Sequence, residues 1–164
     1  MEPFAPEQAE AFATICVASL SADGDFDDTY RARLYDGLRR FPGTAELDTP
    51  QHTELLRSGL RSLHRHGAGK ALRRAAGLLS GEQREESFAW ACEMAVASGK
   101  ASGETSDIVR RIRSTLGISD TVLCAVRHSA SLRYGEDIAA PVFADARLDI
   151  ESASDAGHRG RKAP

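Results

Sequence analysis

The sequence predicts an all-α fold, a compact bundle of about seven helices built from two related helix-loop-helix units. Three observations favour it: apolar residues recur every three or four positions, capping residues and glycines separate these segments, and no segment alternates β-branched and aromatic residues for long. The chain has 164 residues, of which 41% are hydrophobic and 27% charged, which suits one globular domain. We place this domain over residues 1–144.

The first predicted helix covers residues 6–22. Pro6 suits the first turn of a helix, where its missing N–H would have no partner in any case. From Phe12 onward, apolar or small residues recur at +3, +4, +7 and +8 and therefore share one face. The aspartate-rich run 23–28 ends this helix, and a late aspartate of the run caps a second helix that stops before Pro42.

Capping signals mark the next three helices. We assign Thr49 as the N-cap of a third helix that ends at Gly67, and a shorter fourth helix follows over about 72–79. Ser80 and Gln83 have the spacing of a capping box and begin the fifth helix, whose apolar stripe is the clearest in the chain.

The last predicted helices are the sixth, which Gly117 closes, and the seventh, which Ser119 caps. Beyond Gly135 the helical period of apolar residues is lost. We therefore expect residues 145–164 to be a disordered tail.

Composition excludes several classes of protein. No apolar run is long enough for a membrane span and the start has no secretory signal, so we expect a cytoplasmic protein. The three cysteines have no CxxC spacing and are expected to be small buried hydrophobes. A net charge of -3 gives no reason to expect a nucleic-acid partner. Without a nucleophile motif, P-loop or HExxH motif, the chain is expected not to be an enzyme.

Four aspartates between the first two helices form a candidate metal site. Asp23, Asp25, Asp27 and Asp28 lie within six residues, and carboxylate oxygens are ligands for Ca²⁺ or Mg²⁺. The spacing is not that of an EF-hand, because the positions that require Gly and Glu hold Asp28 and Leu34. The alternative is that Asp27 or Asp28 only caps the following helix.

Arginines spaced four residues apart form a candidate partner-binding ridge on the third helix. Arg57, Arg61 and Arg65 share one face, and residues 51–80 carry six basic residues against one acid, whereas residues 1–50 carry ten acids against four basic residues. Such a ridge can bind phosphate groups, an acidic protein or an anionic membrane surface. It can also be a solvated helix face, or the complement of the acidic first unit within the molecule.

Two helix-loop-helix units suggest an internal duplication. One runs from Phe12 to Phe41 around Gly24, and the other from Phe88 to Leu116 around Gly99. In each, a long apolar helix enters the loop and a second amphipathic helix leaves it. Packed face to face, the two units would bury both apolar stripes in one core.

These units resemble the TerB-like (tellurite-resistance) family over roughly residues 8–120. The turn Ala22-Asp23-Gly24-Asp25 and the closing segment Leu116-Gly117-Ile118-Ser119 carry the resemblance. In that family both turns tend to hold Asp-Gly followed by a glutamate, whereas the second turn here holds Ser98-Gly99 with Glu104 and the first lacks the glutamate. Only part of the family's acidic set is therefore present.

The resemblance implies a small non-catalytic helical binding module of bacterial stress or tellurite-resistance systems. Such a module would dock on a protein or membrane-proximal partner. Two alternatives remain open at this point: a divalent-metal-binding protein that uses Asp23, Asp25, Asp27 and Glu104, and a structural subunit that only oligomerises.

Overall fold

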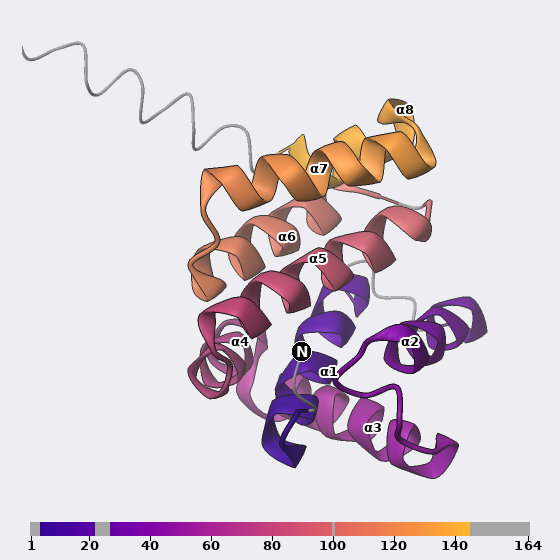
Figure 1. The fold of residues 1–164 in the computed structure, drawn as a ribbon, viewed down its shortest axis with the longest axis vertical. Helices are drawn as coiled ribbons and strands as arrows, with labels where there is room; N and C mark the ends of the chain where they lie inside the picture. Colours follow the sequence, from indigo (N-terminus) through magenta and orange to yellow (C-terminus); the bar gives the residue numbers. More distant parts are fainter. Residues whose placement is uncertain (1–3, 22–26, 100, 145–164) are drawn as a thin grey trace, which may run out of the picture.

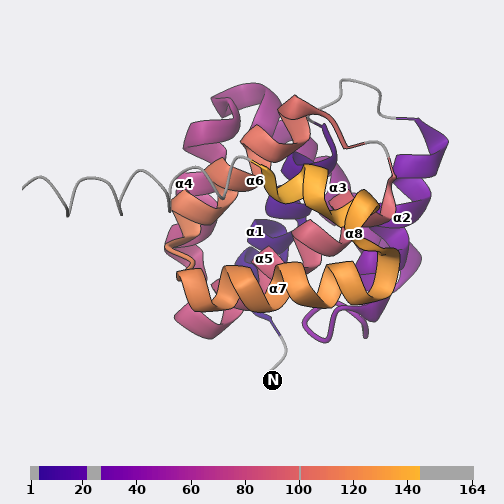
Figure 2. The same ribbon diagram turned by 90° about the horizontal axis from the view of Figure 1, so that it is seen from above.

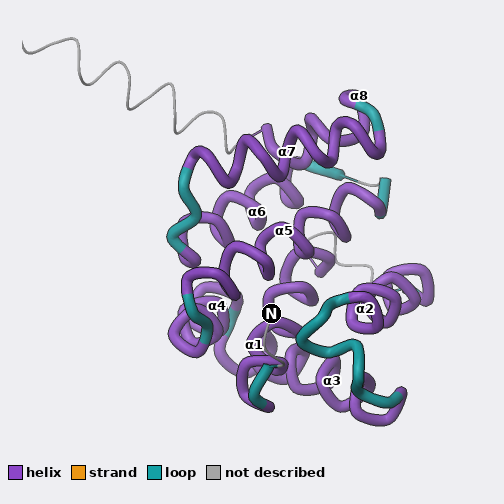
Figure 3. Tube along the Cα trace, viewed as in Figure 1, coloured by secondary structure: helices purple, strands orange, loops and turns teal. Residues whose placement is uncertain are grey.

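The computed structural model describes residues 4–21, 27–99 and 101–144, and over these residues every regular element is a helix (Figures 1 and 3). The predicted all-α fold is confirmed. The helices are α1 (Pro6–Leu20), α2 (Asp28–Arg40), α3 (Thr49–His66), α4 (Ala68–Leu78), α5 (Gly81–Ala97), α6 (Gly103–Leu116), α7 (Asp120–Tyr134), α8 (Glu136–Ala139) and the 3-10 segment η2 (Ala140–Phe143).

Helix α1 is the centre of the molecule. It packs against α2, α3, α4, α5 and α6, and 11 of its 15 residues are buried. Many of these residues are alanines, whose small side chains let neighbouring helices approach closely. In α5, by contrast, 7 of 17 residues are buried, so the first helices of the two sequence units have different surroundings.

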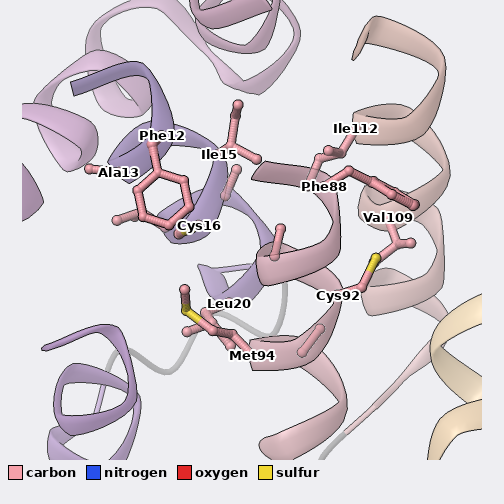
Figure 4. Close-up of a cluster of buried hydrophobic side chains, with 14 of the residues drawn as sticks. Phe12, Ala13, Ile15, Cys16, Leu20, Phe88, Cys92, Met94, Val109 and Ile112 are labelled. Carbon is pink, nitrogen blue, oxygen red and sulfur yellow. The ribbon is translucent and has the colours of Figure 1, made fainter. Parts of the chain in front are cut away.

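The hydrophobic core joins α1 to α5 and α6 (Figure 4). Phe12, Cys16, Phe88 and Cys92 all belong to this one buried cluster, as the apolar stripes predict. The ring of Phe12 also stacks on that of Phe41, with their centroids 3.8 Å apart. Residues from both sequence units therefore share a single core.

The capping residues agree with the sequence at most helix ends. Ser80 and Gln83 form the predicted capping box, Ser119 caps α7, and Gly117 closes α6 in the left-handed conformation. The N-cap predicted for the third helix is wrong by one residue. Asp48 holds that position, because its carboxylate accepts a hydrogen bond from the backbone N–H of Gln51 at 2.8 Å.

Two helix boundaries differ from the prediction. Helix α1 ends at Leu20 rather than at residue 22, while α4 begins at Ala68, about four residues before the predicted start. The segment after Gly135 is also more ordered than its lack of period suggested, because α8 and η2 follow and bury Val142 and Phe143. These two residues occupy a single 3-10 turn, which is too short to show a period in the sequence.

Helix α7 and the α8–η2 segment form the end of the molecule opposite α3, as Figures 1 and 2 show. Helix α7 packs on α5, and η2 packs on α6. The turn Ala22–Asp25 and the predicted tail 145–164 lie outside the described residues.

The close approach of α3 to α1 depends on Gly59. A Cβ atom at this position would lie 3.2 Å from the backbone of Thr14, and a backbone cannot rotate away as a side chain can. Gly59→Ala should therefore lower the free energy of unfolding by about 1 kcal/mol or more, even though alanine is the better helix former.

Gly77 in α4 is the matched control, because no atom lies within 4 Å of a Cβ atom built there. Gly77→Ala should raise the free energy of unfolding by about 0.4–1 kcal/mol. Urea denaturation of both variants measures the difference. Equal stabilisation by the two substitutions would show that α3 and α1 do not meet at Gly59.

Candidate anion-binding site

A basic cavity of about 190 Å³ lies between α1, α3 and α4. Helix α3 provides most of its lining, and α1 and α4 each contribute one charged residue. The lining consists of Glu10 from α1, Ser58, Arg61, Ser62, Arg65 and His66 from α3, and Arg74 from α4. Two arginines of the predicted ridge, Arg61 and Arg65, therefore lie in a shared cavity.

The local sequence explains how these residues meet. Ser58, Ser62 and His66 follow one another at intervals of four residues, and Arg65 comes three residues after Ser62, which places all four towards one side of α3. The chain turns at Gly67, where φ is +73°, a backbone conformation that favours glycine. Helix α4 begins directly after this turn and contributes Arg74 to the same cavity.

The guanidinium groups of the cavity have few acidic partners. Arg61 donates to Glu54, also on α3, at 2.6 Å, and both side chains are more than half exposed. Among the described residues, no carboxylate forms an ion pair with Arg65 or Arg74. Glu10 is the acidic residue of the lining, so three guanidinium groups face one carboxylate. The cavity is therefore electropositive.

The surroundings of His66 favour the neutral form of its side chain. Partial burial and the positive charges of Arg74, Lys70 and Arg65 lower the pKa of its imidazole. At neutral pH the ring therefore offers one N–H donor without a charge, and protonation at lower pH would add a positive charge to the cavity.

Arg57, the third residue of the predicted ridge, is exposed and does not line the cavity. Arg73 on α4 does not line the cavity either, because its side chain is directed towards α6. Its guanidinium group and that of Arg111 on α6 would both lie 3.6 Å from a Cβ atom built at Gly69. Within the described residues, no ion pair joins the basic strip 51–80 to the acidic first unit.

The residues of the predicted metal site are only partly described. The side chain of Asp27 caps α2 by accepting a hydrogen bond from the N–H of Tyr30 at 3.0 Å, as the capping alternative predicted. Asp23 and Asp25 lie outside the described residues. In the part that is described, no three His, Cys, Asp or Glu side chains come close enough together to hold a metal ion.

Glu104 lines a separate cavity of about 450 Å³ at the start of α6. Ser21, which follows α1, lines the same cavity together with Asp107 and Arg111. The end of α1 and the beginning of α6 therefore lie close to each other.

Two further features were not predicted. A groove of about 390 Å³ separates α5 from α7, and Trp90 and Glu93 line it. Glu93 accepts hydrogen bonds from Arg133 and from the hydroxyl of Tyr134, both at 2.6 Å.

The expectation of three buried cysteines is wrong for Cys124, which is exposed on α7 because that helix buries little of its surface.

Comparison of the chain with protein-family models, with curated proteins and with solved structures finds no match. Among the described helices, none is both long and apolar enough to cross a bilayer.

Proposed function

We propose that the protein is a non-catalytic helical binding module that docks on an acidic protein partner through one basic face. This basic face consists of Arg57, Arg61, Arg65 and Arg74, which are all exposed. The observation that carries the proposal is the convergence of Arg61, Arg65 and Arg74 on one cavity, where the last two form no ion pair among the described residues. Arginine is suited to this role, because its planar group binds carboxylates and phosphates through two parallel hydrogen bonds.

The electrostatic arrangement supports binding over a purely structural role for these residues. A surface arginine with a nearby carboxylate already has its charge partly compensated, and Arg61 is such a residue. Arg65 and Arg74 are not compensated in this way, so an incoming anion replaces no internal ion pair of theirs. The resemblance to TerB-like proteins adds the biological setting of the proposal, a role in bacterial stress or tellurite resistance.

A labelled peptide of glutamates tests the proposed face. The full chain should bind this peptide, and the affinity should fall with added salt, because the attraction is between charges. Arg57→Glu/Arg65→Glu should weaken binding at least about tenfold, since reversed charges repel the peptide. Fluorescence anisotropy measures the dissociation constants.

The matched control is Arg31→Glu/Arg40→Glu, which makes the same change in net charge on α2. In the wild type, Arg31 and Arg40 form exposed ion pairs with Asp28 and Asp36, and the loss of such pairs costs little stability. Binding by the control should stay within about twofold of the wild type. Equal losses in the two variants would refute a specific face.

The other functions make different predictions. Tight binding of Ca²⁺, Mg²⁺ or Zn²⁺ in calorimetry would favour a metal-binding protein that uses Asp23, Asp25, Asp27 and Glu104. A stable oligomer in light scattering that fails to bind the acidic peptide would favour the structural subunit. Binding to vesicles of phosphatidylglycerol but not to the peptide would favour a membrane surface as the docking partner.

A further inference from the structure

We propose that the cavity between α1, α3 and α4, which Arg61 also lines, binds one phosphate monoester group through Arg65, Arg74, Ser58 and Ser62. This inference rests on the proposed function in one respect: the docking partner is a protein, and that protein would carry the phosphate on a side chain. The phosphate site itself can be tested independently of that partner.

The first argument is the size of the cavity. Its volume of about 190 Å³ is below the range of about 300–1,000 Å³ that whole cofactors and drug-sized ligands occupy. It is several times the share of about 30 Å³ that one water molecule has in the liquid. A single tetrahedral group with its ester oxygen suits this space.

The second argument is the number and kind of hydrogen-bond donors. Each of the guanidinium groups of Arg65 and Arg74 can donate two parallel hydrogen bonds to adjacent oxygens of a phosphate. The half-buried hydroxyls of Ser58 and Ser62 add two short donors on the α3 wall. Donors thus reach the anion from two helices, which favours a compact group with several free oxygens.

The third argument is the charge of the lining. Arg61 is already paired with Glu54, whereas Arg65 and Arg74 form no ion pair among the described residues, so the two positive charges of these two arginines are available to a dianion. Glu10, in the α1 part of the lining, repels any anion, so a bound phosphate depends on the combined attraction of both arginines. A phosphodiester carries one charge and two blocked oxygens, so a lipid headgroup of that kind uses fewer of the donors.

Calorimetry with inorganic phosphate tests the site without a partner. The wild-type chain should bind phosphate with a dissociation constant of about 1 mM, in the range expected for a few charged hydrogen bonds at an accessible site. In Arg65→Gln/Arg74→Gln the affinity should fall by at least about tenfold. The unfolding temperature measured without phosphate shows that the variant is folded.

The matched control removes two positive charges from another helix. Arg31→Gln/Arg40→Gln alters residues of α2 that lie outside both the cavity and the basic face, so phosphate affinity should stay within about twofold of the wild type. Equal weakening in both double variants would show that phosphate responds only to net charge and would overturn the site.

The dependence on pH gives an independent readout, with sulfate as a probe whose charge is constant between pH 5 and 8. His66 faces Glu10 from α1, Arg74 and Lys70 from α4, and Arg65 on its own helix. Because protonation adds a positive charge, sulfate should bind more tightly as the pH falls below the ordinary histidine value of about 6.5. His66→Asn should remove most of this change, and an unaltered pH profile would contradict the placement of His66 beside the anion.

The source of the phosphate is tested with a neutral peptide of glycine and alanine around one phosphoserine. The phosphopeptide should bind at least about tenfold more tightly than its unphosphorylated form, and Arg65→Gln/Arg74→Gln should abolish this preference. If inorganic phosphate binds but the phosphopeptide is not preferred over its unphosphorylated form, a phosphorylated protein is not the source of the phosphate. Preference for phosphatidylglycerol vesicles over both phosphate probes would overturn the monoester site.

The two proposals fail in different ways. If the glutamate peptide does not bind but phosphate binds in the cavity, the proposed docking of an acidic protein on the basic face is wrong and the phosphate site stands. If the glutamate peptide binds through Arg57 and Arg65 but phosphate does not bind, the cavity has no phosphate site and the docking face stands.

Discussion

Phe12→Ala should lower the free energy of unfolding by about 3–5 kcal/mol. The Phe12 side chain is fully buried on the central helix α1, and its ring stacks on Phe41 and meets the ring of Phe4 edge to face. The substitution leaves a cavity between α1 and the segment after α2, which the surrounding helices can close only in part. The aromatic contacts add about 0.5–1.5 kcal/mol for each pair beyond the loss of buried surface.

Urea denaturation followed by circular dichroism measures this effect. Phe12→Leu is the matched control, because it keeps most of the apolar volume and removes the aromatic contacts, so it should cost clearly less than Phe12→Ala. A loss below about 0.5 kcal/mol for Phe12→Ala, as for a surface substitution, would place Phe12 outside the core.

Phe88→Ala should cost about 3 kcal/mol or more, and unfolding should remain a single transition. Phe88 is fully buried on α5 in the cluster that also holds Phe12, so damage in the second sequence unit must weaken the first unit as well. Leu132→Ala serves as the control, because Leu132 is 75% exposed and its truncation should change stability by less than about 0.5 kcal/mol.

Two separate transitions in the Phe88→Ala variant would contradict the single core. They would mean that residues around α1 and residues around α5 fold as independent units. The same result would also remove the reason for treating residues 1–144 as one domain.

The sequence predicts the helices well because their ends have local causes. The capping box of Ser80 and Gln83, the closing glycine Gly117 and the proline Pro6 each act within a few residues, and each is found where it was predicted. The 3-10 turn that buries Phe143 was missed because one turn shows no period, and its burial depends on α6, which is distant in the sequence.

The candidate site was predicted only in part. The spacing of Arg61 and Arg65 on one helix could be read from the sequence, and so could the basic character of residues 51–80. The cavity depends on packing: Glu10 reaches it because α1 lies against α3, and Arg74 reaches it because the chain turns at Gly67. No local pattern separates Arg65, which lines the cavity, from Arg57, which does not.

The pattern of amide chemical shifts on titration with inorganic phosphate tests the phosphate cavity most directly. In two-dimensional NMR spectra of the full chain, the largest changes should map to the cavity, at Ser58, Ser62, Arg65, His66 and Arg74, with Glu10 on the facing helix. These changes should saturate together with one dissociation constant. Small, unsaturated changes spread over exposed arginines such as Arg31 and Arg40 on α2 would contradict a phosphate site in this cavity.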